Sequence, residues 1–179
     1  IDHSAELTAW KRLRPGIFDA SLAVASACSA TGARLVHIGS CAEYGALRSP
    51  LSEEMRCCPT TAYGAMKLAA TQAILGMTRS GVLDAVVLRP FRAHGPHDLI
   101  SLVAQACQAA VQALPLEITA GQQVREWNGV YEIAEGIMAA GAHPDLKGQI
   151  LNIGGGPRAS VRDVARKVFE LAGAPPELL

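Results

Sequence analysis

The segment Arg34-Leu-Val-His-Ile-Gly-Ser40 predicts a buried β-strand that runs directly into a tight turn. Val36 and Ile38 are β-branched, and a short apolar run bounded by a turn is typical of a strand covered on both faces. Before this strand, residues 16–31 are rich in alanine, carry apolar side chains at helical spacing, and are followed by Gly32 as a C-cap. A helix that leads into a buried strand is the first indication of an α/β fold.

The same alternation continues along the chain. Residues 45–60 contain glycine and proline without a period and predict a loop, after which Thr60 or Thr61 caps a helix that runs to about Arg79 and ends at Gly81. Residues 84–89 form the next predicted strand, which Pro90 stops. Further helices are expected at 98–113, 131–141 and 161–172, and further strands at 115–119 and 149–153. This order favours a doubly wound, largely parallel sheet with helices on both faces.

Composition limits the classes of function. Half of the residues are hydrophobic and 18% are charged, which predicts a packed globular core. The 16 basic residues balance the 16 acidic ones, and no run of 18 apolar residues occurs, so neither nucleic acid nor a membrane is an expected partner. The five cysteines show no C-x-x-C spacing, which predicts reduced thiols in a cytoplasmic protein without a zinc site or disulfides.

Candidate catalytic groups follow the two predicted strands. Ser40 comes after the first strand and residues 90–92 after the second, at the strand ends where doubly wound sheets bind ligands. Between them, Tyr63-Gly-Ala-Met-Lys67 places a phenol and an ammonium on one face of a helix, one turn apart. An ammonium favours the phenolate, and a serine hydroxyl holds a substrate oxygen, so the three groups suit acid–base chemistry at a carbinol or carbonyl carbon beside a nicotinamide. The Tyr-Lys pair taken alone is a weak signal, because Tyr and Lys four residues apart occur by chance on many exposed helices.

Five motifs in order resemble the extended short-chain dehydrogenase/reductase family, in its NAD-dependent epimerase/dehydratase group of sugar-nucleotide enzymes. Members carry Ser-Ser-x-x-x-Tyr-Gly, Tyr-x-x-x-Lys, Arg-Pro-x-Asn-x-Tyr-Gly-Pro, Arg-Asp-aromatic and Asn-x-Gly. The corresponding segments here are Gly39-Ser40 with Tyr44-Gly45, Tyr63 with Lys67, Arg89-Pro-Phe-Arg-Ala-His-Gly95-Pro96, Arg125-Glu126-Trp127, and Asn152-Ile-Gly154. The resemblance implies a Rossmann-like fold, with residues 1–97 as the C-terminal half of an NAD(P)-binding domain. Residues 98–179 would form mainly a small substrate-binding lobe, with a strand that returns to the sheet.

The resemblance also implies roles for individual residues. Ser40 would be the catalytic serine, Tyr63 the general acid/base, and Lys67 the residue that supports Tyr63 and holds the nicotinamide ribose. Pro90 and Phe91 would lie against the nicotinamide end of NAD or NADP. The expected substrate-binding residues are Ser40, Arg92, His94 and Arg125, the last as a clamp on the nucleotide diphosphate. A solvated surface arginine is the alternative for Arg125.

Three departures from the family pattern qualify these expectations. The G-x-x-G-x-x-G turn that binds the cofactor phosphates is absent, and Gly154-Gly-Gly156 fits a tight turn before the last helix instead. The chain is therefore expected to be a fragment or a processed product that binds a dinucleotide poorly alone. Cys41-Ala42 stand where 4,6-dehydratases carry Asp-Glu, which leaves 4-epimerisation or 4-keto reduction. Arg92 and His94 replace the family's Asn and Tyr, which leaves the sugar open, and His94 with His97 lacks the third ligand of a metal site.

These observations predict an NAD(P)-dependent oxidoreductase that acts at C4 of a nucleoside-diphosphate sugar. The alternatives are a non-catalytic NAD(P)-binding regulatory module and a truncated remnant of such an enzyme. Relatives in the family commonly pair through a four-helix bundle, so the resemblance implies a homodimer for the complete protein. Residues 18–31 and 66–77 are small and apolar enough on two faces to permit such packing, whereas burial against the chain's own sheet accounts for only one face of each helix.

Overall fold

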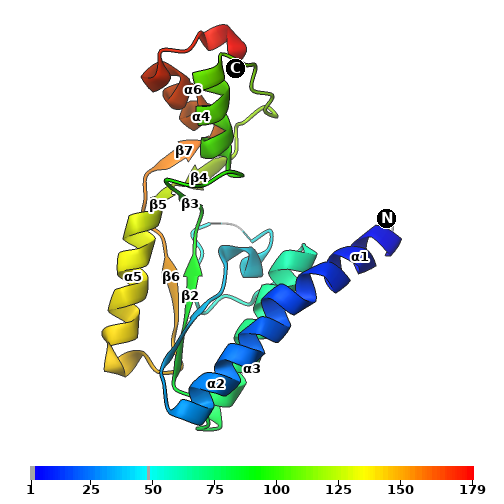
Figure 1. The fold of residues 1–179 in the computed structure, drawn as a ribbon, viewed down its shortest axis with the longest axis vertical. Coiled ribbons are helices and arrows are strands. Elements are labelled where there is room, and N and C mark those ends of the chain that lie inside the picture. Colours follow the sequence, from blue (N-terminus) through cyan, green and yellow to red (C-terminus); the bar gives the residue numbers. More distant parts are fainter. Residues whose placement is uncertain (1–2, 48) are drawn as a thin grey trace. The chain divides into compact units, whose positions relative to one another are not determined.

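The computed structural model describes residues 3–47 and 49–179, so Arg48 of the predicted loop lies outside the described residues. The chain divides into two units (Figure 1). The first contains the residues up to Pro90 together with Glu135–Ile153, and the second contains Phe91–Ala134 and Gly154–Leu179.

The first unit is built on a parallel sheet in the order β1-β2-β6, formed by Leu35–Ile38, Ala85–Pro90 and Ile150–Ile153. Helices α2 (Ala20–Thr31) and α3 (Ala62–Arg79) cover the face onto which Val87 points, where Ala25, Ile74 and Leu75 complete a core. The opposite face presents Val86 and Leu88 to Ala140 of α5 (Val130–Ala142). Neighbouring residues of β2 therefore pack into two separate hydrophobic cores, one on each face of the sheet. The predicted parallel sheet with helices on both faces, a Rossmann-like α/β arrangement, is confirmed.

The ends of the first two helical segments follow from local chemistry. The helix expected over 16–31 ends as predicted at Gly32, whose φ of 70° is left-handed, but it extends back through α1 (His3–Arg14). A π-helical turn at Pro15–Asp19 joins α1 to α2, as expected where proline offers no N–H to the preceding turn. Helix α3 begins after Thr61, and not after Thr60, because the Thr61 hydroxyl accepts the Gly64 N–H at 3.1 Å.

The second unit packs α4 (Leu102–Gln112) against α6 (Val161–Ala172). Phe169 of α6 is buried among Ala106, Ala109 and Ala110 of α4, since small side chains on α4 leave room for the ring. Two short ribbons complete the unit. Strand β3 (Ala93–His94) runs parallel to β5 (Asn128–Gly129), and β4 (Val124–Glu126) runs antiparallel to β7 (Arg158–Ser160).

Two predictions in this unit were wrong. Residues 115–119 do not form a strand, because the Leu116 N–H donates to the Leu178 carbonyl of a 3₁₀ turn at Pro176–Leu178 and not to a neighbouring strand (2.8 Å). The helix expected from residue 98 begins only at Leu102. Asp98 accepts the N–H of Ser101 at 3.0 Å in a turn, and the Ser101 hydroxyl then caps α4. Among the described residues, no helix is long and apolar enough to cross a membrane.

Candidate active site

Ser40 is fixed in the turn that follows β1. It is buried and lies at the N-cap of a 3₁₀ helix, Cys41–Tyr44. Its Oγ accepts the Ala42 N–H at 3.1 Å, while its own N–H donates to Glu43 Oε1 at 3.0 Å. These reciprocal bonds form a capping box, which sets the direction of the Ser40 side chain.

Helix α3 brings Tyr63 and Lys67 to this turn. The Thr61 cap places Tyr63 in the first turn of the helix with 42% of its surface exposed. Lys67 Nζ donates to the Ile38 carbonyl at the end of β1 at 2.9 Å and lies 5.9 Å from the centre of the Tyr63 ring. A Cβ on Gly64 would collide with the Ala42 carbonyl, so only glycine lets α3 approach the Ser40 turn this closely. The structure therefore brings the elements that carry Ser40, Tyr63 and Lys67 into direct contact.

Burial shifts the pKa values of two basic side chains, Lys67 and His37. Desolvation lowers the pKa of Lys67 below its usual range, and the charge of Glu43 partly offsets that effect. Desolvation, with a further contribution from Lys67, lowers the pKa of His37 to about 4. His37 is therefore neutral at neutral pH and adds no positive charge beside Lys67.

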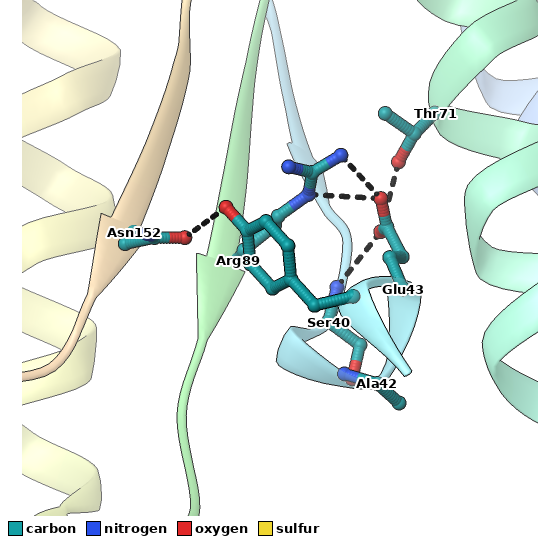
Figure 2. A network of polar contacts seen from close by, with 7 residues as sticks. Ser40, Ala42, Glu43, Thr71, Arg89 and Asn152 are labelled. Atoms are coloured by element: carbon teal, nitrogen blue, oxygen red, sulfur yellow. Dashed lines mark hydrogen bonds and ion pairs between the residues drawn. The ribbon is translucent and has the colours of Figure 1, made fainter. Parts of the chain in front are cut away.

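Sequence reasoning missed the buried carboxylate that links these elements. Glu43 is fully buried, and its Oε2 lies 2.9 Å from both Nε and Nη2 of Arg89, which is 1% exposed (Figure 2). Thr71 of α3 donates to Glu43 Oε1 at 3.0 Å. The Arg89 guanidinium also lies 4.6 Å from the centre of the Tyr44 ring. Desolvation opposes the charge on Arg89, but Tyr44 and Glu43 together raise its pKa above the usual value. A signal existed, since Glu43 and Arg89 are charged residues inside otherwise apolar elements.

The first and the fifth of the five sequence motifs contact each other through Tyr44 and Asn152. The Tyr44 hydroxyl donates to Asn152 Oδ1 at 2.8 Å, and the Asn152 amide donates to the Leu51 carbonyl at 3.2 Å. The Asn152 N–H also donates to Glu53 Oε1 at 2.7 Å. Tyr44 and Asn152 therefore hold the loop between β1 and α3 to the sheet.

The remaining predicted site residues are divided between the two units. Pro90 ends β2 in the first unit, and Phe91 opens the second. Within the second unit, the Arg92 carbonyl accepts the Asn128 N–H at 3.0 Å, and Arg125 is exposed with Nη1 donating to the Val124 carbonyl at 2.9 Å.

His94 lines a cavity of about 430 Å³ in the second unit. Its wall consists of His94, Val103, Trp127, Gly129, Glu132, Pro157, Val164, Lys167 and Val168. Arg92 and Arg125 are not part of that wall, and both side chains are exposed.

The glycine run 154–156 uses its amides internally. Gly155 N–H donates to Glu126 Oε2 at 3.3 Å, and Gly156 N–H donates to Asn128 Oδ1 at 2.9 Å. These two donors are therefore occupied by the protein and are not presented to a phosphate. Across residues 3–47 and 49–179, no group of three or more His, Cys, Asp or Glu side chains is arranged to hold a metal ion.

Comparisons with known proteins identify the family of this chain. The model of the NAD dependent epimerase/dehydratase family matches residues 17–154. The chain is 29% identical over 165 residues to dTDP-6-deoxy-L-talose 4-dehydrogenase (NAD(P)(+)) of Kitasatospora kifunensis, covering 86% of this chain and 51% of that protein. It is 32% identical over 164 residues to UDP-glucose 4-epimerase of Streptomyces lividans, covering 82% of this chain and 50% of that one.

Solved structures lead to the same family. MoeE5 in complex with UDP-glucose and NAD superimposes with a TM-score of 0.83 at 29% identity, over 89% of this chain and 55% of that chain. Epimerase Mth375 from Methanothermobacter thermautotrophicus gives a TM-score of 0.81 at 25% identity, over 87% and 49%. The chain spans about half the length of the curated relatives it matches. The resemblance seen in the five sequence motifs is confirmed, and the chain belongs to the NAD dependent epimerase/dehydratase family.

Proposed function

We propose that this chain carries the catalytic residues of an NAD(P)-dependent enzyme that oxidises or reduces C4 of a nucleoside-diphosphate sugar. The observation that carries the proposal is the position of Lys67, which is tied to the Ile38 carbonyl two residues before Ser40 and lies beside the exposed Tyr63 ring. The names of two relatives, a 4-dehydrogenase and a 4-epimerase, both specify chemistry at C4.

Each catalytic side chain has one task in this proposal. Tyr63 exchanges a proton with the oxygen on C4, and the Lys67 ammonium favours the phenolate form that accepts it. Ser40 Oγ already accepts the Ala42 N–H, so its own proton is available to donate to the same substrate oxygen. Bound NAD(P) supplies the hydride acceptor or donor for C4.

The described residues fit one end of the cofactor. Exposed Tyr63 and half-buried Lys67 suit the nicotinamide ribose, and Pro90 is the last residue of β2, with Phe91 directly after it. The diphosphate is not assigned to the glycine run, because the amides of Gly155 and Gly156 have protein acceptors. We therefore assign only the nicotinamide end to these residues.

Substrate binding is proposed for the second unit. Exposed Arg125 suits a diphosphate through its planar guanidinium, and Arg92 and His94 supply donors for sugar hydroxyls. The absence of an acid and a base at Cys41-Ala42 favours epimerisation or keto reduction over dehydration. We further propose that the protein works in the cytoplasm as a homodimer through α2 and α3, where Val24 of α2 is 51% exposed.

Replacing Tyr63 with Phe tests the proposal. Purified full-length protein is incubated with UDP- and dTDP-hexoses and NAD(P), and both NAD(P)H formation and the sugar products are followed. Wild-type protein should turn over, and Tyr63→Phe should lose about 100-fold or more of the rate, since positioned acid–base groups contribute at least that much. The matched control is Tyr131→Phe, because Tyr131 is an exposed tyrosine on α5.

The outcomes separate the alternatives. An undiminished rate in Tyr63→Phe would reject Tyr63 as the acid/base. Tight binding of NAD(P) without turnover of any nucleotide sugar would favour the regulatory module. Net consumption of NAD(P)H identifies a reductase, whereas interconversion of two sugars without net consumption identifies an epimerase.

A further inference from the structure

We propose that Glu43 is the positioning residue of this site and that it sets Ser40 in register with Tyr63 and Lys67 by way of Thr71. This inference rests on the proposed function for those three residues. The basis is that a single buried carboxylate accepts hydrogen bonds from three different elements (Figure 2). These are the turn after β1, helix α3 and strand β2.

The bond to α3 comes from the catalytic face of that helix. Tyr63, Lys67 and Thr71 follow one another at intervals of four residues, so they lie along one face. Thr71 is fully buried and donates to Glu43 Oε1 at 3.0 Å. The Ser40 N–H donates to the same oxygen, also at 3.0 Å. One oxygen atom therefore joins the helix that carries the acid/base to the turn that carries the serine.

The second carboxylate oxygen fixes the orientation of the first. Arg89 Nε and Nη2 both lie 2.9 Å from Glu43 Oε2, in a fork that holds the plane of the carboxylate. Gly39 keeps the space for Oε1 open, because a Cβ at that position would collide with Oε1 and come within 3.3 Å of Thr71 Oγ1. Rotation of the carboxylate is thus restrained from both sides.

A purely structural role for Glu43 makes a different prediction from a positioning role. If Glu43 only neutralises Arg89, then removing the Thr71 hydroxyl should affect stability alone, since the ion pair is left intact. If Glu43 positions Ser40, the same change should release the Ser40 turn from α3. It should then lower catalysis more than it lowers stability.

The test uses Thr71→Val, its conservative partner Thr71→Ser, and Thr78→Val as a matched control. Thr78 is also a buried threonine of α3, but its hydroxyl donates to the Ile74 carbonyl of the same helix at 2.9 Å. We expect kcat to fall about 10-fold or more in Thr71→Val with KM for NAD(P) changed less than about twofold, because small misplacements of catalytic groups have large effects on rate. Thr71→Ser should restore kcat, and Thr78→Val should leave it unchanged at a comparable denaturation midpoint.

A second measurement does not depend on activity. Hydrogen exchange of the Ser40 amide, followed by NMR, should become about 10-fold faster in Thr71→Val but not in Thr78→Val. Where Thr71→Val does not fold, Thr71→Ala is measured in the same way. Equal kcat and equal Ser40 exchange in Thr71→Val and Thr78→Val would overturn the inference. If the wild-type protein shows no turnover while Ser40 exchange still rises in Thr71→Val, the proposed function fails and the positioning contact stands.

Discussion

Replacement of Glu43 by Gln should destabilise the first unit far more than an ordinary Glu→Gln change. The substitution removes the negative charge beside Arg89, a guanidinium that is 1% exposed and lies 2.9 Å from Glu43 Oε2 through two nitrogens. Breaking a buried ion pair by removing one partner costs about 3–5 kcal/mol, because the remaining charge has no compensation. At about 2–4 °C per kcal/mol for a chain of this size, the melting midpoint should fall by roughly 6–20 °C.

Urea unfolding followed by circular dichroism measures the effect. Glu43→Gln, Arg89→Met and the double variant form a cycle, and the double variant should recover at least about 2 kcal/mol of the summed losses because no buried charge is left unpaired. The control is Glu170→Gln in the exposed pair Lys167–Glu170, where both side chains are more than half exposed and the expected loss is about 0.5 kcal/mol or less. A loss for Glu43→Gln no larger than that of Glu170→Gln would refute the reasoning.

Three further predictions test the surroundings of the site. The pKa of His37 is about 4 in the folded chain and 6.5 in the unfolded chain, so the unfolded state binds the proton first as the pH falls. The free energy of unfolding should therefore decrease by about 3 kcal/mol between pH 6.5 and pH 4. Urea unfolding at a series of pH values measures this decrease, which should be smaller in His37→Leu. Gly39→Ala should lower the free energy of unfolding by about 1–3 kcal/mol, because the new Cβ would clash with Glu43 Oε1. The control is Gly76→Ala in α3, where a Cβ has open space and the free energy of unfolding should rise by up to about 1 kcal/mol. Equal thermal midpoints of the two variants would contradict the clash. Tyr44→Phe leaves Asn152 Oδ1 without its hydrogen-bond donor and should lower the free energy of unfolding by about 1–3 kcal/mol. Proteolysis in the loop 45–60 should also become faster. An unchanged cleavage rate would exclude a role of Tyr44 in anchoring that loop.

Local signals were sufficient for most of the architecture. Gly32 and Thr61 mark helix ends because each satisfies backbone groups within a few residues. The apolar runs at 34–38 and 84–89 predicted strands because both faces of a parallel sheet are buried. Spacing along one helix likewise placed Tyr63 and Lys67 on the same face.

Contacts between distant segments were beyond such signals. Residues 115–119 carry a strand-like pattern, yet their backbone bonds to Leu178 at the far end of the chain. The run Ser40 to Tyr44 gave no reason to pair Glu43 with Arg89, which lies 46 residues further on, or Tyr44 with Asn152, which lies 108 residues further on.

The sequence thus specified the alternation of helices and strands, the family and the candidate site residues, since these depend on backbone capping, side-chain period and motif order over short spans. The folded chain added the buried carboxylate that joins the Ser40 turn to the Tyr63 helix. This contact exists because the parallel sheet places the ends of β1 and β2 side by side and α3 packs across them. The Ser40 N–H, the Thr71 hydroxyl and the Arg89 guanidinium, which come from separate parts of the sequence, therefore all donate to the Glu43 carboxylate.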